Sequence, residues 1–162
     1  MNKVYLLLGS NLGDRQAALD RAGRFLEKGV GPIIRKSACY STAPWGKTDQ
    51  PEFLNQVLVV HTNLSPEKIL ICLLAIEKKM GRIRQERYAP RRIDIDILFY
   101  GKQIIRQPHL TIPHPHIAER RFVLTPLNEL SPAFIHPIHH KNIHQLLSIC
   151  RDRLTVKKFK PG

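Results

Sequence analysis

The sequence predicts an α+β fold: a ferredoxin-like βαββαβ sheet with helices packed on it and a C-terminal extension. The first supporting observation is the order of the apolar patterns. Strand-like runs and two segments with helical spacing follow one another as βαββαβ over residues 3–100. The second is chain length, because 162 residues suit one hydrophobic core. We therefore expect a single domain over residues 1–162.

Turn or capping residues bound each of the six core elements. We expect a strand at 3–8, a helix at 14–28, strands at 33–40 and 53–61, a helix at 65–80 and a strand at 93–100. The first strand is an apolar run that ends in a Gly-Ser-Asn turn, and Gly29 ends the helix after it. A loop at 41–51 that contains Pro and Gly separates the second strand from the third. Ser65 suits the cap of the second helix, Pro66 suits its first turn, and Gly81 ends it.

The residues after position 100 form the extension. No internal repeat or linker is visible there or elsewhere in the chain. We expect a short extended piece, a loop rich in Pro and His at 108–115, helices near 120–129 and 142–150, and a frayed tail at 157–162.

The chain is strongly basic. Lys and Arg total 26 against 13 acidic residues, and this net charge of +13 attracts nucleic acid, anionic lipid and nucleotide phosphates alike. Five arginines between Arg82 and Arg92 mark one segment as a candidate for phosphate contacts. No signal peptide or membrane-spanning run is visible, and three widely spaced cysteines suggest reduced thiols. We expect a cytoplasmic protein without a membrane partner.

Asp94 and Asp96 belong to the pattern IDIDI at 93–97. Alternate side chains of a strand share a face, so both carboxylates project together while the isoleucines face the core. Carboxylates about 7 Å apart on one face repel each other, and a divalent cation would relieve that repulsion. Oxygen ligands on a rigid strand suit Mg²⁺. The alternative is the acidic outer face of a half-exposed strand.

The arginine-rich segment directly precedes these carboxylates. Arginine binds phosphate oxygens in bidentate fashion and keeps its charge at any working pH. A metal site beside such a segment is what phosphoryl transfer requires, because both neutralise oxygens that gain charge as the leaving group departs. A solvated basic loop is the alternative. Glu77 ends an apolar helical stripe beside this segment, and is either an ion-pair anchor or a ligand contact.

Patterns for other chemistries are weaker. The loop at 9–14 lacks the spacing of both GxxxxGK[ST] and GxGxxG, so we interpret it as a tight turn. Eight histidines could suggest zinc, yet no cysteine completes a structural site and no HExxH occurs. No serine lies in a GxSxG setting and no cysteine has a nearby base, which argues against covalent catalysis.

Several motifs with characteristic order and spacing cover most of the chain. They are LLLGSNLGD at 6–14, TAPWGKTDQPEFLN at 42–55, ExxMGRIR at 77–84, RYAPRRIDIDIL at 87–98 and LTIPHPHIAERRFVLTPL at 110–127. Together they resemble the 6-hydroxymethyl-7,8-dihydropterin pyrophosphokinase family, whose fold is similar to the βαββαβ core expected above. The PRxIDID pattern followed by LTIPHP is very specific.

The resemblance implies that Asp94 and Asp96 hold two Mg²⁺ ions bridging the phosphates of ATP, the co-substrate. The arginines implied to contact these phosphates are Arg82 and Arg91, as catalytic candidates, together with Arg84 and Arg87. The other residues implied to line the ATP pocket are Glu77, Leu98, Leu110, Thr111 and His114.

The same resemblance implies a pterin ring stacked between Phe53 and Phe122. The residues implied around that ring are Thr42, Ala43, Trp45, Asn55 and Arg120. A flat heteroaromatic ring gains from two aromatic faces and a few fixed polar partners. Phe53 stands where the family commonly has tyrosine, and loss of the hydroxyl leaves stacking intact.

The implied reaction is attack of the pterin's hydroxymethyl oxygen on the β-phosphorus of ATP, which releases AMP in a step of folate biosynthesis. No residue stands out as a base, so catalysis would rest on positioning and charge neutralisation. We expect a monomer whose partners are ATP and hydroxymethyl-dihydropterin, with no specific nucleic-acid binding.

Two other functions are weighed against this one. An RNA-recognition module shares the βαββαβ plan but needs exposed aromatic residues on its central strands, which this sequence lacks. A metal-dependent phosphohydrolase also uses paired aspartates, and would produce AMP and diphosphate without the pterin.

Overall fold

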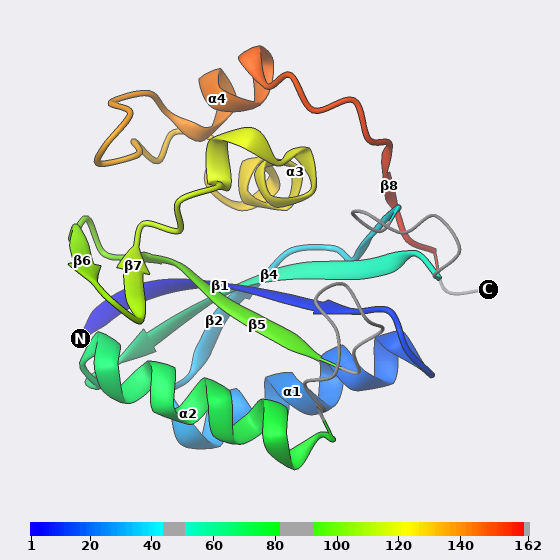
Figure 1. The fold of residues 1–162 in the computed structure, drawn as a ribbon, viewed down its shortest axis with the longest axis vertical. Helices are drawn as coiled ribbons and strands as arrows, with labels where there is room; N and C mark the ends of the chain where they lie inside the picture. Colours follow the sequence, from blue (N-terminus) through cyan, green and yellow to red (C-terminus); the bar gives the residue numbers. More distant parts are fainter. Residues whose placement is uncertain (44–50, 82–92, 161–162) are drawn as a thin grey trace.

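The computed structural model describes residues 1–43, 51–81 and 93–160, which form a mixed fold around one large sheet (Figure 1). The strands of this sheet are β1 (Asn2–Ser10), β2 (Ile33–Lys36), β3 (Tyr40–Thr42), β4 (Phe53–Thr62), β5 (Asp94–Tyr100) and β8 (Val156–Lys158). They lie in the order β5-β1-β4-β3-β8, with β2 also paired to β4, and every pairing is antiparallel. A separate hairpin consists of β6 (Ile105–Gln107) and β7 (Leu110–Ile112).

Helices cover both faces of the large sheet. They are α1 (Arg15–Gly29), α2 (Pro66–Lys79), α3 (Arg121–Leu130), α4 (Ile143–Ile149) and a 3₁₀ turn, η1 (Ile117–Glu119). In Figure 1, α1 and α2 lie below the sheet, and α3 and α4 lie above it. The predicted βαββαβ core with its C-terminal extension is confirmed, and the extension supplies the third layer. None of the helices within the described ranges is both long and apolar enough to cross a membrane.

The central strand β1 requires both of these helical layers. Every side chain of β1 from position 4 to position 10 is buried. Leu6 and Leu8 join a core cluster with residues of α1 and α2. Tyr5 and Leu7 belong to a second cluster with residues of α3 and α4. Because burial of each leucine contributes roughly 1.5–3 kcal/mol, both faces of β1 stabilise the fold.

Both helices of the βαββαβ core begin at the predicted positions, and each is capped by a side chain. The side chain of Asp14 accepts a hydrogen bond from the backbone N–H of Ala17 at 3.1 Å. Ser65 accepts one from the N–H of Lys68 at 3.3 Å, with Pro66 in the first turn. Such caps contribute about 1 kcal/mol each.

The single strand predicted at 33–40 is instead divided into β2 and β3. The interruption is at Ser37, whose N–H donates to the carbonyl of Val57 while its hydroxyl accepts from the N–H of Val57. The side chain of Gln56 also donates to the carbonyl of Ser37. A side-chain hydroxyl thus replaces a backbone group in the ladder, which the apolar pattern could not show.

The prediction of a frayed tail is wrong for residues 157–159. Strand β8 pairs with β3, and the N–H of Phe159 donates to the carbonyl of Cys39 at 2.8 Å. The ring of Phe159 packs against the core cluster of α1 and α2, below the guanidinium of Arg15. A three-residue strand is too short to produce a recognisable alternation.

Substitution by alanine should have opposite effects on stability at two glycines near the end of α1. A Cβ on Gly31 would lie 1.9 Å from the carbonyl oxygen of His61, so Gly31→Ala should lower the free energy of unfolding by about 1–3 kcal/mol or more. A Cβ on Gly29 meets nothing within 4 Å, and Gly29→Ala should raise it by about 0.5–1 kcal/mol through helix propensity. Urea denaturation measures both variants. Equal stability of the two variants would contradict this prediction.

Candidate active site

A row of residues crosses four strands on the face of the sheet that α3 covers. In the cross-strand register, Asp94 of β5 lies opposite Gly9 of β1, and Gly9 lies opposite Asn55 of β4. Asn55 in turn lies opposite Tyr40 of β3. Adjacent strands are about 4.8 Å apart, so roughly 10 Å separates the strand of Asp94 from that of Asn55. The row therefore places a carboxylate and an amide on either side of a position without a side chain.

The two predicted carboxylates share this face. Asp94 and Asp96 are half-buried, whereas Ile93, Ile95 and Ile97 are buried in the core cluster on the opposite face. The alternation predicted from the sequence is thus confirmed. Strand β5 is rigidly paired to β1 on one side, so both carboxylates project from fixed backbone.

Gly9 makes room for the side chain of Asn55. A Cβ at Gly9 would lie 2.6 Å from Nδ2 of Asn55 and 3.8 Å from Cδ1 of Phe53. The hydroxyl of Thr42 donates to Oδ1 of Asn55 at 3.2 Å, and Nδ2 of Asn55 donates to the carbonyl of Leu8 at 3.5 Å. These contacts fix the orientation of the buried amide. The sequence interpretation placed Gly9 in a turn, but β1 continues to Ser10, and a glycine inside a strand marks a close approach.

Two aromatic rings come from the two layers that border this face. Phe53 is half-buried and shares a strand face with Asn55, as residues two apart on a strand do. Phe122 is half-buried in the first turn of α3, which packs over β3 and β4. The guanidinium of Arg120 lies 5.9 Å from the centroid of the Phe122 ring. The rings predicted to stack on a pterin thus belong to opposing layers.

Glu129 connects α3 to the strand that carries Thr42. Its carboxylate accepts the hydroxyl of Tyr40 at 2.6 Å and the backbone N–H of Ala38 at 3.1 Å. Burial, the hydrogen bond to Glu129 and the charge of Glu129 together raise the pKa of Tyr40 to about 12. Tyr40 therefore remains a protonated donor at neutral pH. This contact fixes the position of β3 relative to α3.

His114 is a neutral hydrogen-bond donor near Asp94. Burial above all, with the charges of Arg120 and His116, lowers its pKa to about 4, although the charge of Asp94 acts in the opposite direction. Its Nδ1 accepts the backbone N–H of His116 at 3.1 Å, so the neutral ring carries its proton on Nε2. The backbone N–H of His114 donates to the carbonyl of Leu98, which holds the loop against β5. The imidazole can therefore donate to an oxygen of a bound anion without carrying a charge.

The remaining predicted ATP-pocket residues differ in exposure. Glu77 is buried, and its carboxylate accepts the backbone N–H of Ile95 at 2.8 Å, which joins α2 to β5. This backbone contact does not decide between the ion-pair anchor and the ligand contact that the sequence left open. Leu98 and Leu110 are buried in core clusters, and Thr111 is exposed on β7. Ala43 follows β3 and is half-buried.

Several predicted site residues lie outside the described part of the chain. These are Trp45, Arg82, Arg84, Arg87 and Arg91. Trp45 belongs to residues 44–50, and the four arginines belong to residues 82–92.

The donor set at Asp94 and Asp96 fits magnesium. Mg²⁺ takes one or two protein carboxylates and completes its shell with water and substrate phosphates. Among residues 1–43, 51–81 and 93–160, no group of three or more His, Cys, Asp or Glu side chains is placed to hold a metal ion. This part of the chain therefore offers two oxygen ligands on one strand face, and offers no closed cage of the kind that structural zinc requires.

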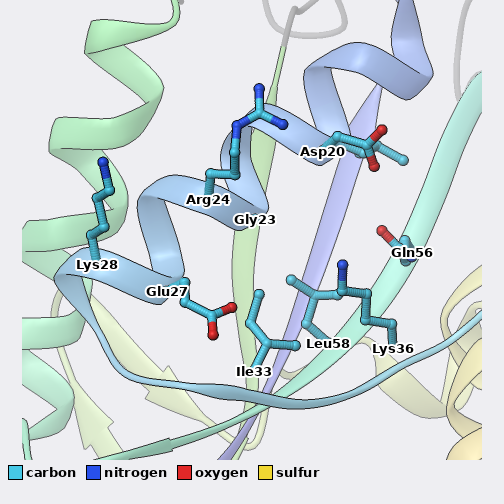
Figure 2. A pocket seen from close by; sticks show the side chains of 10 residues that line it. Asp20, Gly23, Arg24, Glu27, Lys28, Ile33, Lys36, Gln56 and Leu58 are labelled. Atoms are coloured by element: carbon cyan, nitrogen blue, oxygen red, sulfur yellow. The ribbon is translucent and has the colours of Figure 1, made fainter.

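A cleft of about 400 Å³ lies on the opposite side of the sheet, between α1 and strands β2 and β4. Figure 2 shows charged side chains of α1 around it, among them Asp20, Arg24 and Glu27, with Leu58 and Ile33 on its floor. Leu58 belongs to the core cluster of α1 and α2, so the cleft faces away from Asp94 and Asn55. It contains none of the predicted site residues.

Known proteins resemble this chain in sequence and in fold. The model of the 7,8-dihydro-6-hydroxymethylpterin-pyrophosphokinase family matches residues 5–132. A 2-amino-4-hydroxy-6-hydroxymethyldihydropteridine pyrophosphokinase of Methylorubrum extorquens is 43% identical over 136 residues, 83% of this chain and 86% of that protein. The Aquifex aeolicus protein of the same name is 40% identical over 163 residues, 98% of this chain and 96% of that protein. The crystal structure of wild-type Plasmodium falciparum HPPK-DHPS with pteroate has a TM-score of 0.74 at 21% identity, covering 91% of this chain and 42% of that one.

The packing of Asn55 against Gly9 predicts a selective effect of alanine at position 9. Gly9→Ala should displace the amide of Asn55, break its bond with Thr42 and cost about 1–3 kcal/mol of unfolding free energy. Gly23→Ala is a matched control, because its Cβ meets only Cδ1 of Ile33 at 3.8 Å and its helical position favours alanine. Thermal unfolding and the NMR signals of the Asn55 side-chain amide measure both variants. An unshifted Asn55 amide in Gly9→Ala would show that the amide is not held against β1.

Proposed function

The chain belongs to the 7,8-dihydro-6-hydroxymethylpterin-pyrophosphokinase family, and on this premise we propose which of its residues carry out the reaction. The reaction transfers diphosphate from ATP to 6-hydroxymethyl-7,8-dihydropterin in folate synthesis. The hydroxymethyl oxygen bonds to the β-phosphorus, and the bond from that phosphorus to the bridging oxygen of the α-phosphate breaks. AMP leaves with the bridging oxygen, and the hydroxyl proton passes to water.

The observation that carries the proposal is the row Asp94, Gly9, Asn55 across β5, β1 and β4. We assign the Asn55 side to the pterin and the Asp94 side to the ATP phosphates. The missing side chain at Gly9 lets the amide of Asn55 lie against β1 between the two sides. Both sides stand on paired strands, so the reacting groups would be positioned by hydrogen-bonded backbone. Positioning and charge stabilisation together are the main sources of catalysis in phosphoryl transfer.

On the pterin side, Asn55 and Thr42 supply fixed polar partners. An amide oxygen and an amide nitrogen can each form two hydrogen bonds, so the contacts that orient Asn55 leave it able to recognise a donor-acceptor edge. Phe53 and Phe122 are proposed to stack on the two ring faces, with Arg120 beside Phe122. Ala43 and Trp45 are proposed to complete this side.

On the ATP side, Asp94 and Asp96 are proposed to hold two Mg²⁺ ions. Bound magnesium would neutralise charge on the phosphate oxygens. His114 would donate its Nε2–H to a nucleotide oxygen, and its low pKa keeps that donor neutral beside arginines. The residues proposed to contact the phosphates are Arg82, Arg84, Arg87 and Arg91. Those proposed to border the nucleotide are Glu77, Leu98, Leu110 and Thr111.

The cellular setting forms part of the same proposal. We propose a single-domain, cytoplasmic monomer without specific nucleic-acid binding. Cys39, Cys72 and Cys150 are free thiols, which suit a reducing compartment. The sheet face that RNA-recognition modules expose is covered here by α3 and α4, which disfavours that alternative.

Product analysis separates this enzyme from a phosphohydrolase. Purified protein with Mg-ATP and the reduced hydroxymethyl pterin should yield AMP and pterin diphosphate in equal amounts. Without the pterin, AMP formation should be negligible. Release of AMP and free diphosphate without the pterin would favour the hydrolase.

Substitution of either aspartate tests the ATP side. Asp94→Asn and Asp96→Asn keep the side-chain shape but remove a charged ligand, so each should lower turnover on the order of 10²-fold or more. Affinity for Mg-ATP should fall in calorimetry. Asp20→Asn, on an exposed position of α1, makes the same charge change on the far face and should leave turnover unchanged. Full activity in either strand variant would remove the metal site from the proposal.

Removal of either ring tests the pterin side. Phe53→Ala and Phe122→Ala should each weaken pterin binding to the protein saturated with an ATP analogue by roughly ten-fold or more, because stacking adds about 1 kcal/mol beyond area burial. Binding of the analogue itself should be nearly unchanged. Phe25→Ala, also a half-buried ring but on α1, is the control. Equal loss of both ligands would identify the two rings as structural supports.

A further inference from the structure

The C-terminal segment connects two distant parts of the molecule. It leaves α4 after Ile149, runs beside the sheet and ends in β8 at the edge of β3 (Figure 1, red). We call residues 150–159 the C-terminal strap. The strap follows the part of the chain that the family model matches, residues 5–132.

At its first end, the strap caps α3. Arg120, the N-cap residue of α3, makes no side-chain capping bond. Oδ2 of Asp152 instead accepts the backbone N–H of Arg121 at 3.0 Å, and Oδ1 of Asp152 accepts the N–H of Leu154 at 3.0 Å. A carboxylate at this position satisfies a free N–H of the first turn and interacts favourably with the helix dipole.

The side chain of Arg121 strengthens the same junction. Its Nε donates to the carbonyl of Asp152 at 3.0 Å, and its Nη2 donates to the carbonyl of Cys150 at 3.3 Å. Arg121 lies between Arg120 and Phe122 in the sequence, so this junction determines where those two side chains begin.

At its other end, the strap completes the sheet beside β3. Val156 lies opposite Thr42 in the β8–β3 register, and Lys158 lies opposite Tyr40. Strand β3 is therefore paired on both edges, with β4 on one side and β8 on the other. Phe159 holds this end in place, because its N–H donates to the carbonyl of Cys39 and its half-buried ring packs against the core cluster of α1 and α2.

We propose that the C-terminal strap holds the two walls of the pterin site at a fixed spacing, and that Asp152 is the positioning residue at the α3 wall. One wall is the start of α3 with Phe122, and the other is β3 and β4 with Thr42 and Asn55. The inference rests on the proposed location of the pterin between Phe53 and Phe122. Asp152 acts through α3 and makes no contact with substrate.

Calorimetry with pterin added to the protein saturated with Mg²⁺ and an ATP analogue tests the strap. Asp152→Ala should weaken pterin affinity on the order of five- to ten-fold, as loss of a helix cap allows, while affinity for the analogue stays unchanged. KM for the pterin should rise and kcat at saturation should be retained. Asp152→Asn keeps one acceptor oxygen and should recover part of the affinity. Asp20→Ala, which removes an exposed carboxylate on the far face, should behave as wild type.

Phe159→Ala tests the opposite end of the strap, and should also weaken the pterin selectively. If Asp152→Ala fails to fold, pterin and ATP-analogue affinities of Asp152→Asn and Phe159→Ala, measured by the same calorimetry, test the proposal instead. Wild-type pterin affinity in Asp152→Ala, or equal loss of affinity for the pterin and the ATP analogue, would overturn the proposal.

Phe53→Ala and Phe122→Ala are measured in parallel. Unaltered pterin binding in those two variants would refute the proposed pterin location, whereas loss there with retention in Asp152→Ala would refute the strap alone.

Discussion

The double burial of β1 is the constraint on which the rest of the structure depends. With every side chain from position 4 to position 10 out of solvent, β1 needs apolar partners on both faces. A βαββαβ unit with its two helices on one face leaves the other face open. The extension after residue 100 closes it, because α3 and α4 supply the second core cluster around Tyr5 and Leu7. The extension is thus required for burial of the central strand, and it forms a structural layer of the fold.

The site lies where this second apolar cluster ends. Toward one end of the strands, the face of the sheet carries Tyr5 and Leu7, and toward the other it carries Gly9 and its cross-strand neighbours. The polar groups therefore stand on the same paired backbone as the core, which limits their motion. Burial also keeps His114 and Tyr40 in their neutral, donating forms. In a chain of net charge +13, a neutral donor at His114 would bind an anion without adding repulsion among the cations around it.

Helix α3 is fixed by contacts at several points along its length. Glu129 binds Tyr40 and Ala38, and Arg35 donates to the carbonyl of Leu130. The hydroxyl of Tyr5 bonds to that of Ser131 at 2.6 Å, just beyond the end of the helix. Asp152 holds the first turn. Hydrogen bonds at both ends thus hold α3 in place in addition to its apolar packing on the sheet.

The sequence by itself determined the local features of this protein. The alternation at Asp94 and Asp96 follows from the period of a strand, and the caps at Asp14 and Ser65 follow from the unpaired N–H groups that begin a helix. The motifs also indicated the family that the comparisons show. The tertiary structure alone decided which distant segments meet. Register brings Asp94, Gly9 and Asn55 into one row although they are far apart in the chain, and Asp152 caps a helix that begins 31 residues earlier. Hydrophobic periodicity indicates which side of a segment is buried, but it does not identify the segment that packs there. The roles of Gly9 and Asp152 therefore follow only from the strand pairing and from the position of the strap in the tertiary structure.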